Sequence, residues 1–240
     1  MIDFHSHILP NIDDGSTSVE ESINLIREAS QVGFTGIITT SHYINGYYEC
    51  EEEQRKQLIK ELVQKIKRNG NCKIPELYLG NEIYITTDMV ELIKSGKAST
   101  INGTSYVLFE LPMNSKPLFD KDVIYKLIEN GYRPIIAHPE RYSYIKDNTE
   151  YAQTLKNMGA LFQSNYGSII GLYGNEAKRT LKKLLKMDLI SFFGSDVHAT
   201  NQIYPKIPKA LKKLEKLISA EKLEELTTLN AQKVLNNEEV

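Results

Sequence analysis

The chain has 240 residues, in which 29 lysines and arginines nearly balance 31 aspartates and glutamates, for a formal net charge of -2. This balance excludes the global positive field that draws proteins to nucleic acid or to anionic membranes. No apolar run approaches the roughly 18 residues of a membrane-spanning helix, and no basic region followed by an apolar stretch opens the chain. We expect a cytoplasmic protein without membrane insertion or a nucleic-acid partner, folded as a single domain over residues 1–240.

Short apolar segments alternate with longer segments of helical period, which is typical of parallel βαβ units. In the first helical segment, residues 18–33, apolar residues recur every three or four positions and Gly33 marks the end. We therefore expect an α/β fold, a distorted (β/α)7 TIM-like barrel that is closed or nearly closed, with an open sheet as the alternative. The other predicted helices include residues 51–70, 121–131 and 174–187, and the predicted strands are residues 2–7, 36–42, 76–82, 106–111, 133–138, 160–165 and 189–196.

Nearly every predicted strand ends in an ionisable side chain. Because the carboxyl ends of barrel strands line one face, these side chains should converge. All five histidines of the chain lie in such positions. A single histidine is more simply explained as a hydrogen-bonded core or surface residue, but five together predict a metal site, since imidazole is the commonest metal ligand. The residues concerned are His5, His7, His42, Glu82, Glu110, His138, Asp196 and His198.

The segment after the first strand adds a further carboxylate. His5 and His7 lie two residues apart, so a strand would place both rings on one face. Asp13 and Asp14 follow, next to Gly15, and offer a loop carboxylate above the pair, with a purely turn-forming role as the alternative.

Five imidazoles and four carboxylates without a thiolate are too many ligands for one ion, so we expect two or three. Mixed nitrogen and oxygen ligands favour manganese, iron or zinc over calcium or magnesium, and the residues do not choose among the three. Such clusters hold a hydroxide at neutral pH and favour phosphoester hydrolysis. Arg141 is then a candidate to bind phosphate oxygens, the alternative being a salt bridge to Glu140 or a neighbouring carboxylate.

The cysteines and a cluster of tyrosines are two further candidates for a catalytic or substrate-binding role. Cys50 and Cys72 form neither a CxxC pair nor the C-x5-R loop of cysteine-based tyrosine phosphatases, so we interpret both as incidental. The tyrosine-rich residues 43–48 either stack on an aromatic substrate or form an ordinary exposed loop.

The motifs MIDFHSHILPNIDDG, TTSHY, GNEIY, FELP, AHPERY and GSDVH, in this order and spacing, resemble the PHP (polymerase and histidinol phosphatase) family. The similarity is closest to its branch of bacterial capsule and exopolysaccharide tyrosine phosphatases, and it extends over essentially the whole chain. The resemblance implies a (β/α) barrel with a trinuclear site, usually described with manganese. It also implies dephosphorylation of a partner bacterial tyrosine kinase that controls polysaccharide export.

The resemblance further implies a ligand set. One ion would be held by His5, His7, Glu110 and Asp196, a second by His42, Glu82 and His138 with Glu110 bridging, and a third would be completed by Asp14 and His198. Arg141 matches the phosphate-contacting arginine of the family. A further arginine that commonly follows the last motif is missing, and Lys206 or Tyr204 are its candidate replacements. His198 or His42 would protonate the leaving phenolate, unless metal assistance alone suffices.

Three other functions compete with this interpretation. A small-molecule phosphatase such as histidinol-phosphate phosphatase would share the ligands, but the matches at DDGS, FELP and AHPERY and the compact length favour phosphotyrosine. A non-catalytic metal-binding regulatory module is disfavoured because all nine ligand positions are filled. Nucleic-acid binding is disfavoured because the lysines of residues 208–218 accompany Leu211, Leu214 and Leu217 on one helical face, as in an ordinary solvated helix.

Overall fold

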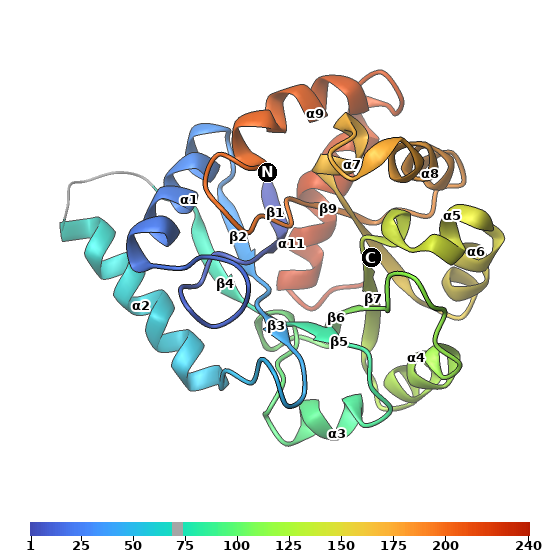
Figure 1. Cartoon of the computed structure of the whole chain (residues 1–240), viewed down its shortest axis with the longest axis horizontal. Helices are drawn as coiled ribbons and strands as arrows, with labels where there is room; N and C mark the ends of the chain where they lie inside the picture. The colour runs from blue at the N-terminus through green and yellow to red at the C-terminus, as the bar shows by residue number, and fades with distance from the viewer. Residues whose placement is uncertain (69–73) are drawn as a thin grey trace.

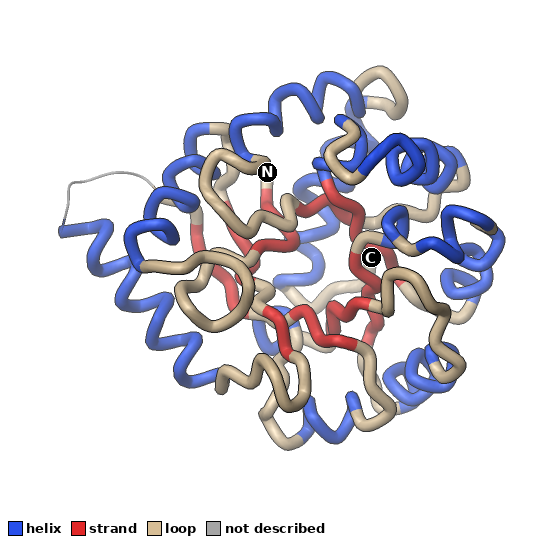
Figure 2. Tube along the Cα trace, viewed as in Figure 1, coloured by secondary structure: helices blue, strands red, loops and turns tan. Residues whose placement is uncertain are grey.

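The structure, a computed structural model, describes residues 1–68 and 74–240, so Cys72 lies outside the described residues. Parallel strands curl around a central axis and helices surround them (Figure 1, Figure 2). One sheet has the order β1-β2-β4 and the other β3-β5-β6-β7-β8-β9, and a parallel bridge from Ser6 to Val197 joins the two. The predicted TIM-like α/β fold is confirmed. The strands are β1 Ile2–Ser6, β2 Gly36–Thr39, β3 His42–Tyr43, β4 Glu76–Leu79, β5 Glu82–Tyr84, β6 Tyr106–Glu110, β7 Arg133–Ala137, β8 Leu161–Asn165 and β9 Phe192–Gly194.

Two predicted strands are each broken into two. Residues 36–42 form β2 and β3, and residues 76–82 form β4 and β5. At the break, the Asn81 side chain donates to the carbonyl of Ser41 at 2.8 Å and accepts from the amide of Ser99 at 2.8 Å. The Asn81 side chain thus adds to the backbone hydrogen bonds that Gly80 and Glu82 donate across the break, and the second sheet begins at His42 and Glu82, which are register partners.

The four predicted helices are confirmed as α1, α2, α4 and α8. Ser18 caps α1 by accepting the amide of Glu21 at 3.1 Å, as N-terminal serines do. The turn after this helix needs the left-handed φ of +96° that Gly33 adopts. The helices are α1 Val19–Gln31, α2 Glu52–Arg68, α3 Met89–Lys94, α4 Asp120–Glu129, α5 Ser143–Asp147, α6 Glu150–Asn157, α7 Tyr166–Ile170, α8 Gly174–Lys186, α9 Ile207–Leu214, α10 Ala220–Glu224 and α11 Asn230–Leu235, with short helical turns at η1 Ile101–Gly103, η2 Pro139–Arg141, η3 Tyr204–Lys206 and η4 Glu225–Leu229.

The inside of the barrel is apolar at its amino-terminal end. Side chains from five strands meet there, and Ala231 and Val234 of α11 pack against them. Phe4 and Phe192 stack within this cluster with ring centroids 4.0 Å apart. The strand members of this cluster, which we call the lower core, are Ile2, Phe4, Ile38, Tyr106, Leu108, Ile135, Ala137 and Phe192.

The inward-facing side chains of the same strands become polar toward the carboxyl ends of the strands. Tyr106 and Leu108 belong to the lower core, and the next residue with period two is Glu110. Phe192 is followed in the same way by Gly194 and Asp196. The barrel therefore places its polar residues as a layer on top of an apolar floor. None of the helices within the described residues is both long and apolar enough to cross a bilayer.

Candidate metal centre

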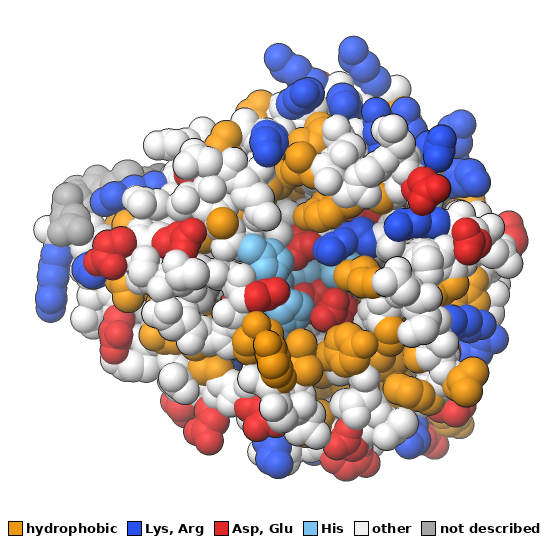
Figure 3. Space-filling view, in the orientation of Figure 1, with side chains coloured by type: hydrophobic (Ala, Val, Ile, Leu, Met, Phe, Trp, Pro, Cys, Tyr) orange, Lys and Arg blue, Asp and Glu red, His pale blue; other side chains and the backbone are white. Residues whose placement is uncertain are grey.

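The nine residues predicted to bind metal converge at the carboxyl ends of the strands. Seven of them line a pocket of about 270 Å³, together with Arg141 and the apolar side chains of Ile44, Tyr48 and Met113. His5 and His7 lie beneath it and are fully buried. Figure 3 shows histidine and acidic side chains gathered in a central hollow of this face. The predicted convergence is therefore observed.

His5 and His7 face each other through their Nε2 atoms, which lie 3.0 Å apart. Each ring uses its other nitrogen for a fixed oxygen: His5 Nδ1 lies 2.7 Å from Gln163 Oε1, and His7 Nδ1 lies 2.9 Å from Asp13 Oδ2. Because those oxygens are acceptors, the Nδ1 atoms carry the protons. The lone pairs of the two Nε2 atoms then point at one another. Because lone pairs repel, this arrangement is favourable only when a positive charge lies between them.

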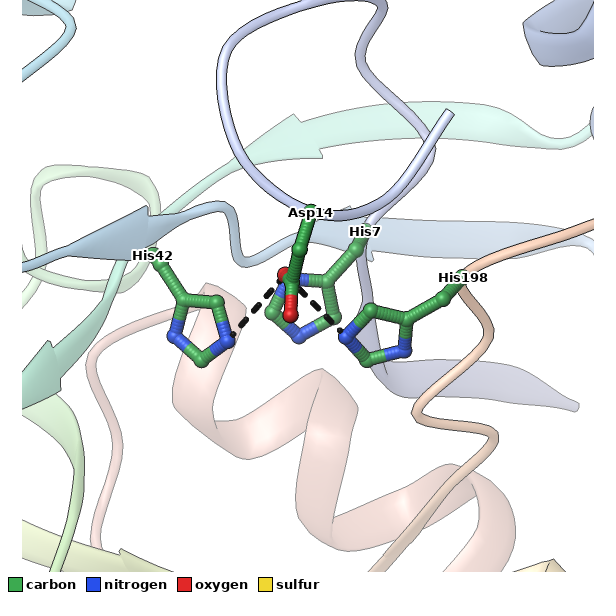
Figure 4. A group of neighbouring side chains, drawn as sticks. All are labelled: His7, Asp14, His42 and His198. Carbon is green, nitrogen blue, oxygen red and sulfur yellow. Dashed lines mark ion pairs between the residues drawn. The ribbon is translucent and has the colours of Figure 1, made fainter. Parts of the chain in front are cut away.

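A second cluster lies at the mouth of the pocket. His7, Asp14, His42 and His198 each bring a ligand atom to within 4.8 Å of the others, and Figure 4 shows the three rings around the carboxylate. Asp14 Oδ1 is 3.5 Å from His42 Nε2 and 3.4 Å from His198 Nε2. His198 Nδ1 donates to the carbonyl of Asp196 at 3.0 Å, so its Nε2 is free to bind a cation.

The adjacent Asp13 has a different position. Its carboxylate accepts from His7 Nδ1 and from the amides of His42 and Gly15. Burial opposes its charge, yet the hydrogen bond and charge of His7 lower the pKa of Asp13 to about 2. Asp13 therefore orients ligands, while Asp14 faces the pocket. The turn needs Gly15, because a Cβ there would lie 2.1 Å from the carbonyl oxygen of His7.

Glu82, Glu110 and His138 form the other side of the site. His138 Nε2 lies 3.0 Å from Glu82 Oε1 and 3.8 Å from Glu110 Oε2. His42 Nδ1 lies 3.2 Å from Glu82 Oε2 and 3.6 Å from Glu110 Oε1, and it has no hydrogen-bond partner within the described residues. Burial, then the charges of Glu82 and Asp196, raise the pKa of Glu110 to about 9. His138 and Glu82 thus hydrogen-bond to each other, and His42, Glu82 and Glu110 bring ligand atoms to within 4.8 Å of one another.

Arg141 reaches the pocket from η2 and pairs with Asp196. Its Nη1 donates to Asp196 Oδ2 at 2.6 Å, and its guanidinium lies over the ring of Tyr173, 4.5 Å from the centroid. The neighbouring Glu140 instead accepts from Ser164, Ser168 and the amide of Asn165, which anchors the η2 turn to β8 and α7. Of the two salt bridges considered for Arg141, the one to a neighbouring carboxylate forms and the one to Glu140 does not.

Two site residues escaped the sequence analysis because they are amides. Gln163 accepts from His5 through Oε1 and donates from Nε2 to Asn165 Oδ1 at 2.9 Å. Asn165 then donates from Nδ2 to Asp196 Oδ2 at 2.7 Å. We call Gln163 and Asn165 the amide relay. The available signal was their period-two position at the end of β8, the strand that brings no ionisable residue to the site.

Neither candidate replacement for the missing arginine faces the pocket. Tyr204 is fully buried and donates its hydroxyl to Asp3 at 2.8 Å, and Lys206 donates to the carbonyl of Gln202 at 2.7 Å. In the tyrosine-rich loop, Tyr48 lines the pocket and stacks beside His42, while Tyr47 is 74 % exposed. One tyrosine of that loop is thus available for contact with a substrate.

The donor set fits divalent cations. Three overlapping groups each bring their ligand atoms to within 4.8 Å, and His7 and His42 each belong to two groups: His7, Asp14, His42 and His198; His5, His7 and Asp196; and His42, Glu82 and Glu110. Shared imidazoles and carboxylates without thiolate are typical ligands of manganese, iron and zinc. How individual residues divide among ions, and which residues act in catalysis, stay predictions.

Comparison with known proteins identifies the family. The profile of the capsular polysaccharide synthesis family CpsB/CapC matches residues 1–236. The chain belongs to this family. The resemblance inferred from the motifs is thereby confirmed.

Curated members of the CpsB/CapC family align with nearly the whole chain. The putative tyrosine-protein phosphatase CapC of Staphylococcus aureus is 36 % identical over 243 residues, covering 100 % of this chain and 93 % of that protein. The tyrosine-protein phosphatase YwqE of Bacillus subtilis is 34 % identical, with 100 % and 93 % covered. The tyrosine-protein phosphatase CpsB of Streptococcus agalactiae is 31 % identical, with 99 % of both chains covered.

Solved structures agree with this assignment. A chain from a study of YwqE from Bacillus subtilis and CpsB from Streptococcus pneumoniae, described as metal-dependent tyrosine phosphatases, superposes with a TM-score of 0.92 at 32 % identity and covers 100 % of this chain and 96 % of that one. A histidinol phosphate phosphatase from Lactococcus lactis superposes with a TM-score of 0.58 at 15 % identity, covering 90 % and 93 %. The second likeness concerns the fold alone.

Proposed function

We propose that this member of the CpsB/CapC family is a metal-dependent phosphatase that hydrolyses phosphotyrosine on a protein. The proposed substrate is a bacterial tyrosine kinase of capsular or exopolysaccharide synthesis, and the proposed cofactor is two or three manganese ions, with iron or zinc as alternatives. The observation that carries the proposal is the convergence of nine nitrogen and oxygen donors, of which seven line a pocket together with Arg141 and two, His5 and His7, are buried beneath it. We also propose that residues 1–240 form one domain.

The proposed ligands are the nine residues named from the sequence. Bound divalent ions would supply Lewis acidity, which offsets phosphate charge and provides a nucleophile at neutral pH. Asp13 and Gln163 keep the protons of His7 and His5 on Nδ1, so that both Nε2 atoms stay free for a cation. The left-handed backbone of Asp196, with φ 54°, turns its carboxylate between Arg141 and the His5–His7 pair.

Arg141 is proposed to bind the phosphate. Its Nη1 is engaged with Asp196, which fixes the guanidinium plane and leaves its other N–H groups for two phosphate oxygens. The side chain is 26 % exposed, so it borders the pocket and solvent at once. Ile44, Tyr48 and Met113 supply an apolar wall that suits the phenyl ring of phosphotyrosine better than a small polar substrate.

His198 and His42 remain the proposed proton donors to the leaving phenolate. His198 is the more accessible, with 25 % of its side chain exposed against 11 % for His42. Its Nδ1 donates to the carbonyl of Asp196, so Nε2 is the atom that would either hold an ion or carry the proton, and His198 acts as the proton donor only where no ion occupies Nε2. Substitution of His198 should then slow the hydrolysis of aryl phosphates whose phenols have a high pKa more than the hydrolysis of p-nitrophenyl phosphate. The p-nitrophenolate anion leaves without a proton.

The test compares substrates on metal-stripped protein reloaded with manganese, zinc or magnesium. We expect metal-dependent release of phosphate from a phosphotyrosyl peptide, with a loss of about 10²-fold in kcat/KM for Arg141→Ala and partial recovery in Arg141→Lys. Release only from histidinol phosphate would refute the substrate class but keep the metal site. No metal-dependent release from either substrate would refute the proposed reaction.

A further inference from the structure

A lysine-lined groove lies between α8 and α9, outside the metal centre. Both helices pack against α7. Lys178 and Lys182 lie one turn apart on α8, while Lys213 and Lys216 face them from α9 and its end, and the hollow measures about 180 Å³. The other lining residues are Ile169, which is buried, and Leu217, which is 41 % exposed. We call these six residues the basic groove.

The positive charge of the basic groove is uncompensated within the described residues. None of its four lysines forms an ion pair or a side-chain hydrogen bond there, although five other lysines of the described chain do. Desolvation, followed by the charges of Lys178, Lys209 and Lys182, lowers the pKa of Lys213. Lysines of two helices thus repel one another across a narrow gap, in a chain whose net charge is -2. A bound anion would relieve this repulsion.

The shape and composition of the groove favour an acidic peptide as the anion. Its lining contains no aromatic side chain for stacking and no arginine for bidentate recognition, which single-stranded nucleic-acid sites normally have. The apolar face of α9 is already buried through Ile207, Ala210 and Leu214, so this helix has no apolar face left to insert into a bilayer. A concave hollow of this size admits carboxylate side chains from an extended chain but not a flat lipid surface.

The basic groove borders the face that carries the pocket. In Figure 1, α8 and α9 flank the site, and Figure 3 shows lysine and arginine side chains along that edge of the same face. α8 also packs against η2, the turn that carries Arg141. A protein that presents a tyrosine to the pocket can therefore extend along the surface into the groove.

We propose that the basic groove docks an extended segment rich in aspartate and glutamate from the protein substrate. The proposal rests on the proposed function where it names the substrate as the carrier of the segment. Docking would act as a second attachment point that raises the local concentration of the phosphotyrosine at the pocket. It would weaken with salt, because the charges involved are only partly buried.

Binding is tested first, with a readout that needs no activity. A fluorescent, unphosphorylated peptide of alternating aspartate and glutamate, and a serine and asparagine peptide of equal length, are titrated with the full chain while anisotropy is measured. The groove variant combines K178Q, K182Q and K213Q. The matched control combines K60Q, K67Q and K126Q, three exposed lysines on α2 and α4 without ion pairs within the described residues. We expect the groove variant alone to bind the acidic peptide about tenfold more weakly.

Kinetics then test the role in substrate choice. Phosphotyrosyl peptides with an acidic or a neutral extension are compared with p-nitrophenyl phosphate. We expect the groove variant to raise KM about five- to tenfold for the acidic peptide only, with kcat and p-nitrophenyl phosphate turnover unchanged. Equal binding by groove and control variants would overturn the proposal, and so would binding of anionic vesicles or single-stranded DNA in place of the peptide. If the wild-type protein binds the acidic peptide but hydrolyses none of these phosphate esters, only the proposed function is refuted.

Discussion

The two ends of the barrel interior are built from the same strands but from opposite chemistry. The lower core fills the amino-terminal end with Phe4, Ile135, Phe192 and other apolar side chains, sealed by α11. The carboxyl end holds buried imidazoles and carboxylates whose lone pairs and negative charges face one another. Burying apolar surface stabilises the fold, whereas burying ionisable groups costs free energy unless they are paired. The lower core therefore supplies folding free energy that offsets the cost of burying the polar layer, and bound cations would lower that cost.

The largest effect is expected from Glu110→Gln. The variant removes a carboxylate of the polar layer that is proposed to bridge two ions, so kcat/KM for a phosphotyrosyl peptide should fall on the order of 10³-fold, about 4 kcal/mol of transition-state stabilisation. The unfolding free energy of the metal-free protein should not fall, because Glu110, with its pKa raised to about 9, must take up a proton on folding at neutral pH, a cost that glutamine does not carry. Glu53→Gln, on the exposed face of α2, is the control. If Glu110→Gln is much less stable but fully active, Glu110 is a structural residue and not a functional one.

The opposite outcome is expected in the lower core. Ile135→Ala should lower the unfolding free energy by about 3 kcal/mol, since the fully buried side chain leaves a cavity that its neighbours fill only in part. Below the melting temperature, metal affinity and kcat should stay close to wild type. Urea unfolding and metal titration of one preparation measure both quantities. If Ile135→Ala weakens metal binding as much as it weakens folding, the two ends are not separable.

A smaller effect is expected from the amide relay, which contacts His5 and Asp196 within the polar layer. Asn165→Leu removes the hydrogen bond to Asp196 and the acceptor for Gln163, so metal affinity should fall roughly 10- to 100-fold. Asn165→Asp keeps the acceptor for Gln163 but places a second carboxylate beside Asp196. Comparing the two variants distinguishes the effect of losing the orientation of Asp196 from the effect of adding a negative charge. Equal metal affinity in wild type and Asn165→Leu would show that Asp196 is held by Arg141 alone.

Single residues show how far the sequence predicted this site. His5, His7, Glu110 and Asp196 were identifiable because an ionisable side chain at the end of an apolar strand is costly and therefore informative. Gln163 and Asn165 were not, since amides carry no charge and are common at strand ends. The local pattern could not distinguish Asp13 from Asp14, because adjacent residues in a turn have no periodicity to orient them, and only the family resemblance selected Asp14.

The sequence by itself determined the succession of strands and helices, the end of the barrel at which chemistry gathers, and the residue types available there. Each of these follows from local patterns: apolar runs, helical period and charge at strand ends. The tertiary structure decided the break at Asn81, the burial of Tyr204 and the convergence of lysines from α8 and α9. These depend on contacts between residues far apart in the chain, and no local pattern encodes which partner a polar side chain will meet.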